Sequence, residues 1–220
     1  MRRTGKQGEW GSVDLTAKKY WIFDLDGTLT VAAHDFDAIK KSLGLSPERP
    51  ILEQLLELPQ AKALDLRRQL DDIERAIARD SKIQPGALKL LQTFANRHIQ
   101  VGILTRNSHA NALETLAVCG LASFFDVSFV LGRESCDPKP SGAGVRQLLS
   151  QWQASPEQAV MVGDYLFDLQ AGRDAGTTTV YFDPSGTYAY AAFADLCVQD
   201  LNQLCVLVEG SDEAASRHRG

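Results

Sequence analysis

The first residues in this sequence that could do chemistry are two aspartates behind a short apolar segment. Residues 20–23 are apolar and long enough for a strand, and Asp24, Asp26 and Gly27 follow it. Side chains two positions apart share a face of an extended backbone, and Gly27 permits a sharp turn behind the pair. Neighbouring carboxylates repel, which raises the pKa of one of them unless a cation intervenes. The pair therefore predicts a functional carboxylate site.

A second apolar segment ends in a run of polar side chains. Residues 99–104 are followed by Thr105, Arg106, Asn107 and Ser108, which precede a helical pattern. The N–H groups at a helix N-terminus attract anions, so a phosphate oxygen could be held here. Taken alone, Asn107 or Ser108 would more simply cap the helix.

Two further segments supply a lysine and two more acids. Lys139 stands between Pro138 and Pro140, which fix the local chain direction, and an ammonium group aimed in this way can neutralise phosphate charge. Asp164 follows another apolar segment, and Asp168 comes one helical turn later. Taken singly, Lys139 is more simply interpreted as a solvated lysine in a turn, and Asp164 is equally well explained as a helix cap.

Together these groups meet the needs of one reaction. Phosphoryl transfer through an aspartyl phosphate requires a carboxylate nucleophile, a neighbouring acid and base, and a hydroxyl and an ammonium group for the phosphate oxygens. Further carboxylates would hold Mg²⁺, which prefers oxygen ligands. The sequence therefore predicts a phosphate site and a Mg²⁺ site in one place.

Apolar segments of strand length alternate with helical patterns along most of the chain. Near-continuous apolar strands between helices are typical of a parallel sheet covered on both faces. The predicted fold is α/β, with a Rossmann-like doubly wound parallel sheet whose ligands bind at the carboxyl ends of the strands. Strands are predicted at 20–23, 99–104, 127–130, 159–162 and 178–181, and helices at 86–97, 107–118, 141–152 and 166–175.

The stretch between the first and second strands carries helical patterns only. Apolar residues recur there in two stripes, at 51–56 and 66–77. The charged residues on the other faces, including Asp71 and Glu74, are interpreted as a solvated surface. A helical insert at this point would stand over the binding edge of the sheet. The predicted domains are a discontinuous core, 1–30 and 84–220, and a small all-helical cap, 31–83.

The composition excludes several function classes. The 220 residues include 23 Lys and Arg against 28 Asp and Glu, a net charge of −5, so no overall positive field would gather nucleic acid or anionic membrane. The apolar segments are far shorter than the roughly 20 residues that a bilayer requires. We expect a cytoplasmic protein with a small-molecule partner. Its oligomeric state stays open, and its cysteines, which show no CxxC spacing, are expected to be reduced.

Some residues receive no functional assignment. Residues 1–17 lack hydrophobic periodicity and are expected to form a loose arm, in which Trp10 could dock, and the tail from Glu209 is expected to fray. His34 and Asp35, just behind the first motif, could reach a substrate, but a surface position is the default expectation for a lone histidine.

The order of the polar groups resembles that of the haloacid dehalogenase (HAD) superfamily of phosphohydrolases. The short insert resembles the cap of its phosphoglycolate phosphatase-like subfamily, although phosphoglycolate phosphatases proper usually carry a larger one. The resemblance implies a Mg²⁺-dependent phosphatase of a small organic phosphate monoester. Tyr165 departs from the pattern, because the family often has a small hydroxyl residue there. Across 20–182, the matching motif residues are Asp24-Leu25-Asp26-Gly27-Thr28, Thr105, Lys139 and Gly163-Asp164 with Asp168.

The resemblance also implies a role for each motif residue. Asp24 corresponds to the nucleophile, and Asp26 to the acid that protonates the leaving oxygen and later activates water. Thr105 and Lys139 correspond to phosphate-holding positions, and Arg106 and Asn107, which follow Thr105, are also expected to bind the substrate. The implied Mg²⁺ ligands are Asp24, Asp164 and the main-chain carbonyl of Asp26, with Asp168 in the neighbourhood of the ion.

Other activities are weighed against this hypothesis. Asp26 argues against a dehalogenase and against a phosphonatase-like enzyme, since both generally lack an acid at that position. A phosphomutase shares every core residue and differs by shielding the phosphoaspartate from water, so it remains an alternative. A phospho-aspartate receiver domain or an inactive binding module is the alternative from another class. The acid pair and the helical insert favour turnover.

Overall fold

Six parallel strands form the centre of the protein, whose computed structural model describes residues 13–210. Each strand pairs in parallel with its neighbours, and the chain's first strand lies inside the sheet. The strand order reverses direction there, which is where ligands bind in doubly wound sheets. The order is β3 (Val130–Leu131), β2 (Gln100–Leu104), β1 (Tyr20–Phe23), β4 (Ala159–Gly163), β5 (Thr178–Phe182) and β6 (Leu196–Val198).

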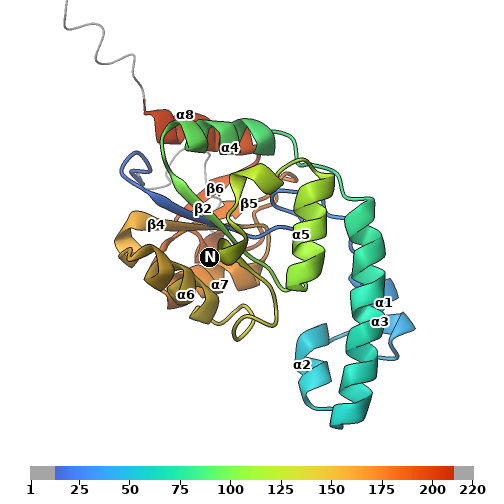
Figure 1. Cartoon of the computed structure of the whole chain (residues 1–220). Coiled ribbons are helices and arrows are strands. Elements are labelled where there is room, and N and C mark those ends of the chain that lie inside the picture. Colours follow the sequence, from blue (N-terminus) through green and yellow to red (C-terminus); the bar gives the residue numbers. More distant parts are fainter. Residues whose placement is uncertain (1–12, 211–220) are drawn as a thin grey trace, which may run out of the picture.

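Helices cover both faces of this sheet (Figure 1). Alternate residues of β1 point to opposite faces, so Trp21 and Phe23 pack into one hydrophobic core and Ile22 into the other. The prediction of an α/β doubly wound fold is confirmed. The first face is covered by α4 (Ala87–Asn96), α5 (His109–Val118) and α8 (Leu201–Glu209), and the second by α6 (Ala143–Trp152) and α7 (Leu166–Asp174).

The third strand lies later in the chain than the sequence predicts. Residues Val127–Phe129 form a 3₁₀ turn, in which the Asp126 side chain accepts a hydrogen bond from the backbone N–H of Ser128. This side-chain bond gives the backbone an alternative to the sheet, so the edge strand β3 begins only at Val130. Strand β6 and helix α8 were not predicted; β6 forms the far edge of the sheet, and α8 packs on its first face.

The segment before β1 is only partly the loose arm that its sequence suggests. Leu15 is buried in the first hydrophobic core, and a turn behind it is closed by the bond from the Lys18 N–H to its carbonyl. The burial of Leu15 could not be predicted, because a single apolar residue shows no periodicity. Trp10 and the tail beyond Gly210 lie outside the described residues. Helix α8 is regular up to Glu209, where the sequence predicts that fraying begins.

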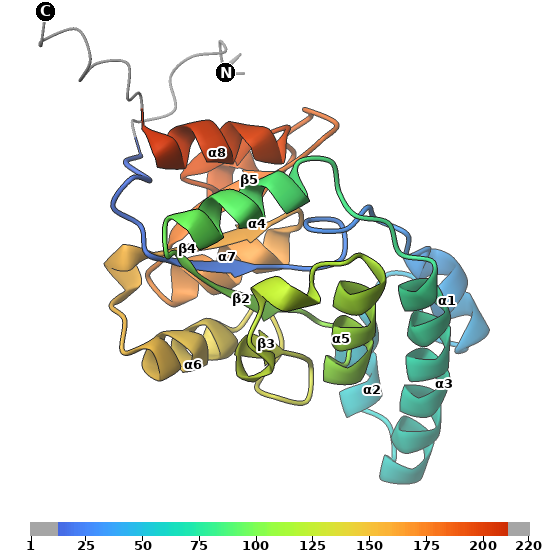
Figure 2. The same cartoon turned by 45° about the horizontal axis from the view of Figure 1, so that its top comes forward.

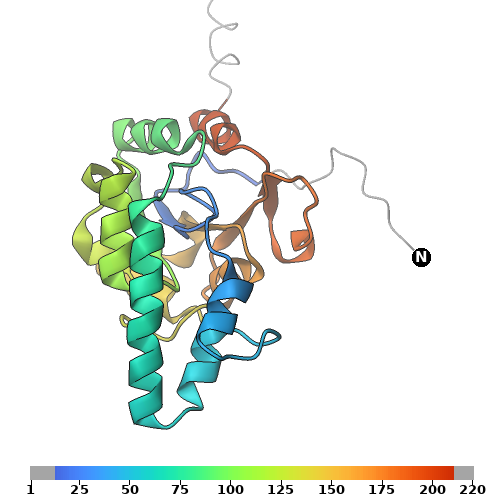
Figure 3. The ribbon, with the colours of Figure 1, turned by 90° about the vertical axis from the view of Figure 1, so that its right-hand side faces the viewer.

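Residues 36–79, in the stretch between β1 and β2, fold into three helices with a hydrophobic cluster of their own. The helices stand together beyond the sheet, and α3 lies along α5 (Figures 2 and 3). Two backbone bonds join the chain where it leaves and returns, from Val31 to Lys82 and from Gln84 to Leu29. The apolar residues of the two stripes predicted at 51–56 and 66–77 pack into this cluster. The helices are α1 (Phe36–Ser42), α2 (Ile51–Leu56) and α3 (Gln60–Arg79).

Two expectations about the chain can be compared with residues 13–210. None of their helices has both the length and the hydropathy that crossing a bilayer demands. The cysteines are all free thiols, as their spacing predicts, and Cys197 and Cys205 are buried among apolar side chains.

Candidate active site

Eight of the residues selected from the sequence line one cavity of about 470 Å³. The cavity lies between the carboxyl ends of the central strands and the helices α1–α3. Phe23 pairs with Ile103 on one side and with Val162 on the other, so the loops behind β1, β2 and β4 leave the sheet at the same edge. The lining includes Asp24, Asp26, Thr105, Arg106, Asn107, Lys139, Asp164 and Asp168.

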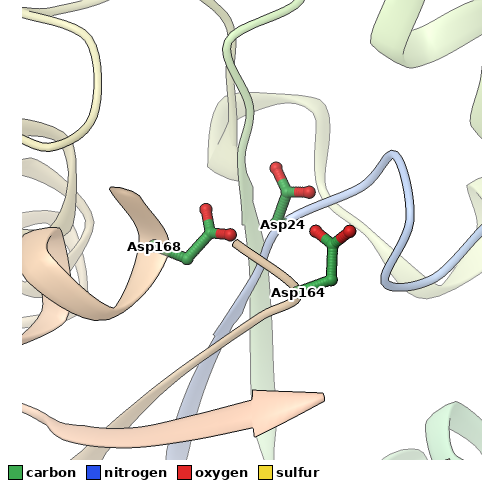
Figure 4. Close-up of side chains that lie close together, drawn as sticks. All are labelled: Asp24, Asp164 and Asp168. Carbon is green, nitrogen blue, oxygen red and sulfur yellow. The ribbon is translucent and has the colours of Figure 1, made fainter. Parts of the chain in front are cut away.

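Three carboxylates, two from these loops and one from the first turn of α7, converge in the cavity (Figure 4). Asp24, Asp164 and Asp168 each present an oxygen, and the three oxygens lie within 4.8 Å of one another. Asp168 is held in the first turn of α7, where it accepts a hydrogen bond of 3.0 Å from the Tyr165 backbone N–H. Gly27 has a φ of 93°, and a Cβ on it would lie 2.2 Å from Asp164, so glycine is required beside the cluster.

Lys139 lies directly against this cluster. Its Nζ is 2.5 Å from Asp24 Oδ1 and 2.5 Å from Asp168 Oδ1, and the side chain is buried. Burial lowers the pKa of Lys139, but the two carboxylates outweigh it and raise the pKa above its ordinary value. An ammonium has three N–H donors, so one remains for a further acceptor in the cavity.

One ammonium does not balance three buried carboxylates. Burial, together with the charges of Asp24 and Asp168, raises the pKa of Asp164 to about 8. Burial also raises the pKa of Asp168 to about 6, against the opposing effect of Lys139. For Asp24 the direction is the same, with burial again the largest cause. The cluster therefore lacks positive charge when all its carboxylates are ionised.

This imbalance predicts how the stability of the metal-free protein depends on pH. The folded pKa values of Asp164 and Asp168 lie above their ordinary value of 3.8, so the fold binds more protons than the unfolded chain. The contribution of these two carboxylates to stability is then fully present below that value and is lost as the pH rises through about 6 and about 8. Urea unfolding in EDTA should show this fall between about pH 4 and about pH 8. Asp164→Asn should flatten it, and an equally steep fall in that variant would show that Asp164 is not its source.

Asp26 lies beside the cluster, in a different environment. Its Oδ2 is 3.4 Å from the Asn107 Nδ2, and its Oδ1 is 3.9 Å from the His34 Nδ1. The His34 side chain is only 7% exposed and stacks on Phe36, so the surface position expected for it is wrong. The turn that carries Asp26 folds back, so the segment that follows it lies over Asp26. The residue types around His34 in the sequence do not reveal this fold. Asp35 caps α1 by accepting a bond from the Ala38 N–H.

Of the residues that follow β2, some cap helix α5 and others line the cavity. Ser108 caps α5 through a bond from the Asn111 N–H to its hydroxyl oxygen, as the simpler interpretation holds. Thr105 is buried, and its Oγ1 accepts a 3.0 Å bond from the Asn107 N–H. The Thr105 hydroxyl hydrogen therefore stays available to an acceptor in the cavity.

The donor set fits a hard divalent cation. The converging ligand atoms are carboxylate oxygens, which Mg²⁺ and Ca²⁺ prefer, and no cysteine or histidine belongs to the group. The raised pKa values of Asp164 and Asp168 show that the cluster lacks a counter-charge, which such a cation would supply.

Comparison with known proteins identifies the family. The model of the haloacid dehalogenase-like hydrolase family matches residues 21–182, which is most of the chain. The chain belongs to the haloacid dehalogenase-like hydrolase family. The resemblance drawn from its motifs is thereby confirmed, as is its classification as a hydrolase.

Several relatives of this haloacid dehalogenase-like hydrolase match it over most of its length. A haloacid dehalogenase-like hydrolase domain-containing protein of Arabidopsis thaliana is 29% identical over 211 residues, covering 86% of this chain and 82% of the relative. The pyrophosphatase PpaX of Listeria monocytogenes is 25% identical over 213 residues, covering 87% and 96%. A crystal structure of a predicted phosphoglycolate phosphatase from Haemophilus somnus is 21% identical, with a TM-score of 0.66 over 86% of this chain and 97% of its own. That likeness shows the shared fold.

Two arginines of this family member join the core loops to α2 and α3. Arg106 donates to both oxygens of Glu53, at 2.8 and 2.7 Å, and also to the Lys139 carbonyl. Its guanidinium lies over the Phe167 ring, 4.8 Å from the centroid. The Glu53 pair thus closes the wall of the cavity between α2 and the loop behind β2.

The second arginine corrects an interpretation of the charges on α3. Arg133 pairs with Asp71 and with Glu74, and Glu74 is only 6% exposed, so these acids do not form a solvated surface. Neither arginine–acid pair was foreseen. The run of acids on α3 was the available signal for an ion pair. Their partner, Arg133, is 59 positions from Glu74 in the sequence, and only the packing of α3 on α5 brings the two close.

Proposed function

We propose that the protein is a Mg²⁺-dependent phosphatase that hydrolyses a small organic phosphate monoester through an aspartyl phosphate on Asp24. The observation that carries this proposal is the convergence of Asp24, Asp26, Thr105, Lys139 and Asp164 on one cavity from separate parts of the chain. Structural carboxylates alone do not explain the arrangement, because three of them lie together with one ammonium.

In the first half-reaction, a carboxylate oxygen of Asp24 attacks phosphorus. The bond between phosphorus and the ester oxygen breaks, and Asp26 gives its proton to that leaving oxygen. The products of this step are the alcohol and a phosphorylated Asp24. Lys139 holds Asp24 Oδ1 and so fixes the orientation of the nucleophile.

In the second half-reaction, Asp26 takes a proton from a water molecule, whose oxygen attacks the same phosphorus. The bond between phosphorus and Asp24 breaks, and phosphate leaves with the oxygen of that water. Asp24 returns as a carboxylate and Asp26 as an acid. Asn107 and His34 lie next to Asp26 and keep its carboxyl group inside the cavity.

The phosphate oxygens are held by groups with an unused donor. These are the Thr105 hydroxyl and the third N–H of Lys139, with the side-chain amide of Asn107 beside them. Arg106 borders this site and contributes a wall. All of these donors act on charge that grows as the phosphoryl group is transferred.

Mg²⁺ would be held by Asp24, Asp164 and the main-chain carbonyl of Asp26. Asp168 would lie beside the ion, where it fixes Lys139 and the turn of Tyr165. When bound, the ion supplies charge for the cluster and lowers the repulsion between Asp24 and the phosphate.

We also propose the domain division foreseen from the sequence, with a core of 1–30 and 84–220 and a cap of 31–83. The support is the separate hydrophobic cluster of α1–α3 and the pair of backbone links at Val31 and Gln84. In this position the cap limits the access of water while the aspartyl phosphate forms.

Phosphate release from an aryl phosphate tests the proposal. We expect continuous turnover with Mg²⁺ and loss of activity in EDTA, restored by adding Mg²⁺ back, because the carboxylates repel the substrate unless the ion is present. Full activity after rigorous metal removal would overturn the metal assignment. Labelling that stops after a single phosphate per protein would point to the receiver alternative instead.

A further inference from the structure

The cavity continues well beyond the groups that would hold the phosphate. From Asp24 it extends to Phe36 and Lys40 of α1 and to Ile51 and Leu52 of α2. Its volume of about 470 Å³ is that of a site for a sizeable small molecule. A leaving group of two or three carbons would leave most of this space to water, so the cavity suits a larger alcohol.

The walls of this outer part hold no spare positive charge. Among the described residues, every lysine and arginine that lines the cavity already has a carboxylate partner. A second anionic group on the substrate would have to compete with these carboxylates for a cation, which weakens its binding. The pairs are Lys40 with Asp37, Arg49 with Glu57, Arg106 with Glu53, Arg133 with Asp71 and Glu74, and Lys139 with Asp24 and Asp168.

Two aromatic side chains offer flat apolar surface to the cavity. Phe36 lies on the α1 side, where it stacks on His34 with ring centroids 5.5 Å apart, yet it remains 56% exposed. Tyr165 lines the cavity on the α7 side, is also exposed, and is supported edge-on by Phe167. A large exposed aromatic residue that lines a cavity is typical of a surface for stacking a ring.

From these features we infer that the leaving group of the substrate is an uncharged, ring-bearing alcohol of about nucleoside size, which packs on Phe36. The inference rests on the proposed phosphatase function and narrows its substrate class. Phosphorylated carboxylic acids and bisphosphates are disfavoured, because their second anion meets only cations that are already paired.

Three phosphate esters test separately how the charge and the shape of the leaving group affect turnover. 3-Phosphoglycerate and glycerol 1-phosphate have nearly the same size, but only the first carries a carboxylate, and uridine 5′-monophosphate adds an uncharged ring system. We expect kcat/KM to rise at least about tenfold from the first to the second, and again from the second to the third. Equal or reversed values at either step would overturn the inference.

A substitution at Phe36 locates the ring site. Phe36→Ala should lower kcat/KM for uridine 5′-monophosphate about tenfold, mainly through KM, and for glycerol 1-phosphate by less than about threefold. The matched control is Leu64→Ala, because Leu64 is 47% exposed on α3 and does not line the cavity. Similar losses for both esters in Phe36→Ala would contradict stacking on that ring.

The two proposals fail in different ways. If the protein hydrolyses the aryl phosphate but prefers 3-phosphoglycerate, the phosphatase stands and the inference about the leaving group is wrong. If no ester is hydrolysed in the presence of Mg²⁺, the proposed function falls and the inference falls with it.

Discussion

Asp24→Asn is expected to abolish phosphate release, with kcat reduced at least about 1000-fold. The amide has nearly the shape of the carboxylate, but its oxygen carries no charge to attack phosphorus and cannot form the aspartyl phosphate. The loss should therefore be as large for an aryl phosphate, which has a good leaving group, as for an alkyl phosphate. Steady-state phosphate release on both esters measures this.

The fold should survive this change, which separates a chemical loss from a structural one. Asp24 is one of three carboxylates in a cluster whose burial raises its pKa, and Lys139 keeps its second partner, Asp168. Removing one charge relieves repulsion, so the melting temperature in EDTA at about pH 8 should be equal to or higher than that of the wild type. Asp72→Asn, at an exposed position on α3, is the control and should retain activity. Turnover by Asp24→Asn close to the wild-type rate would rule out Asp24 as the nucleophile.

Lys139→Met is expected to cost both activity and stability. The change leaves Asp24 and Asp168 buried without their shared ammonium group, and breaking a buried ion pair in this way costs about 3–5 kcal/mol. Phosphate also loses a donor, so kcat/KM should fall by about 100-fold or more. Urea unfolding and phosphate release are the measurements.

The loss of stability in Lys139→Met should depend on pH in a defined direction. Without the lysine, the carboxylates take up protons more readily, so the penalty should be smaller at about pH 5 than at about pH 8. A mere loss of packing would cost the same at both values. Lys89→Met, on the exposed face of α4, is the control and should change the unfolding free energy by less than about 0.5 kcal/mol.

Much of the site could be predicted because parallel strands end at a common edge. Asp24, Thr105 and Asp164 each follow an apolar strand, and a doubly wound sheet brings such strand ends together whatever their separation in the chain. The positions of these strands can be predicted from the apolar segments of the sequence alone. The edge strand β3 was harder, because local hydrogen bonding at Asp126 competes with a short sheet pairing.

The surroundings of that site could not be foreseen in the same way. His34 is a lone residue in a loop, and nothing in its neighbours shows that it is buried against Asp26. The charges of α3 alternate as they do on a solvated helix, and only docking against α5 turns Glu74 inward to Arg133. Helical periodicity identifies which face of a helix is apolar, but not what covers its charged face.

The sequence by itself determined the fold class, the order of the motifs and the strand ends that Asp24, Thr105 and Asp164 follow. These depend on local patterns of apolar and polar residues. The tertiary structure alone decided the pairing of Arg106 with Glu53 and of Arg133 with α3, and therefore the charge balance and size of the cavity. Such pairs join residues more than fifty positions apart, and their geometry exists only once the helices between β1 and β2 have packed against the core.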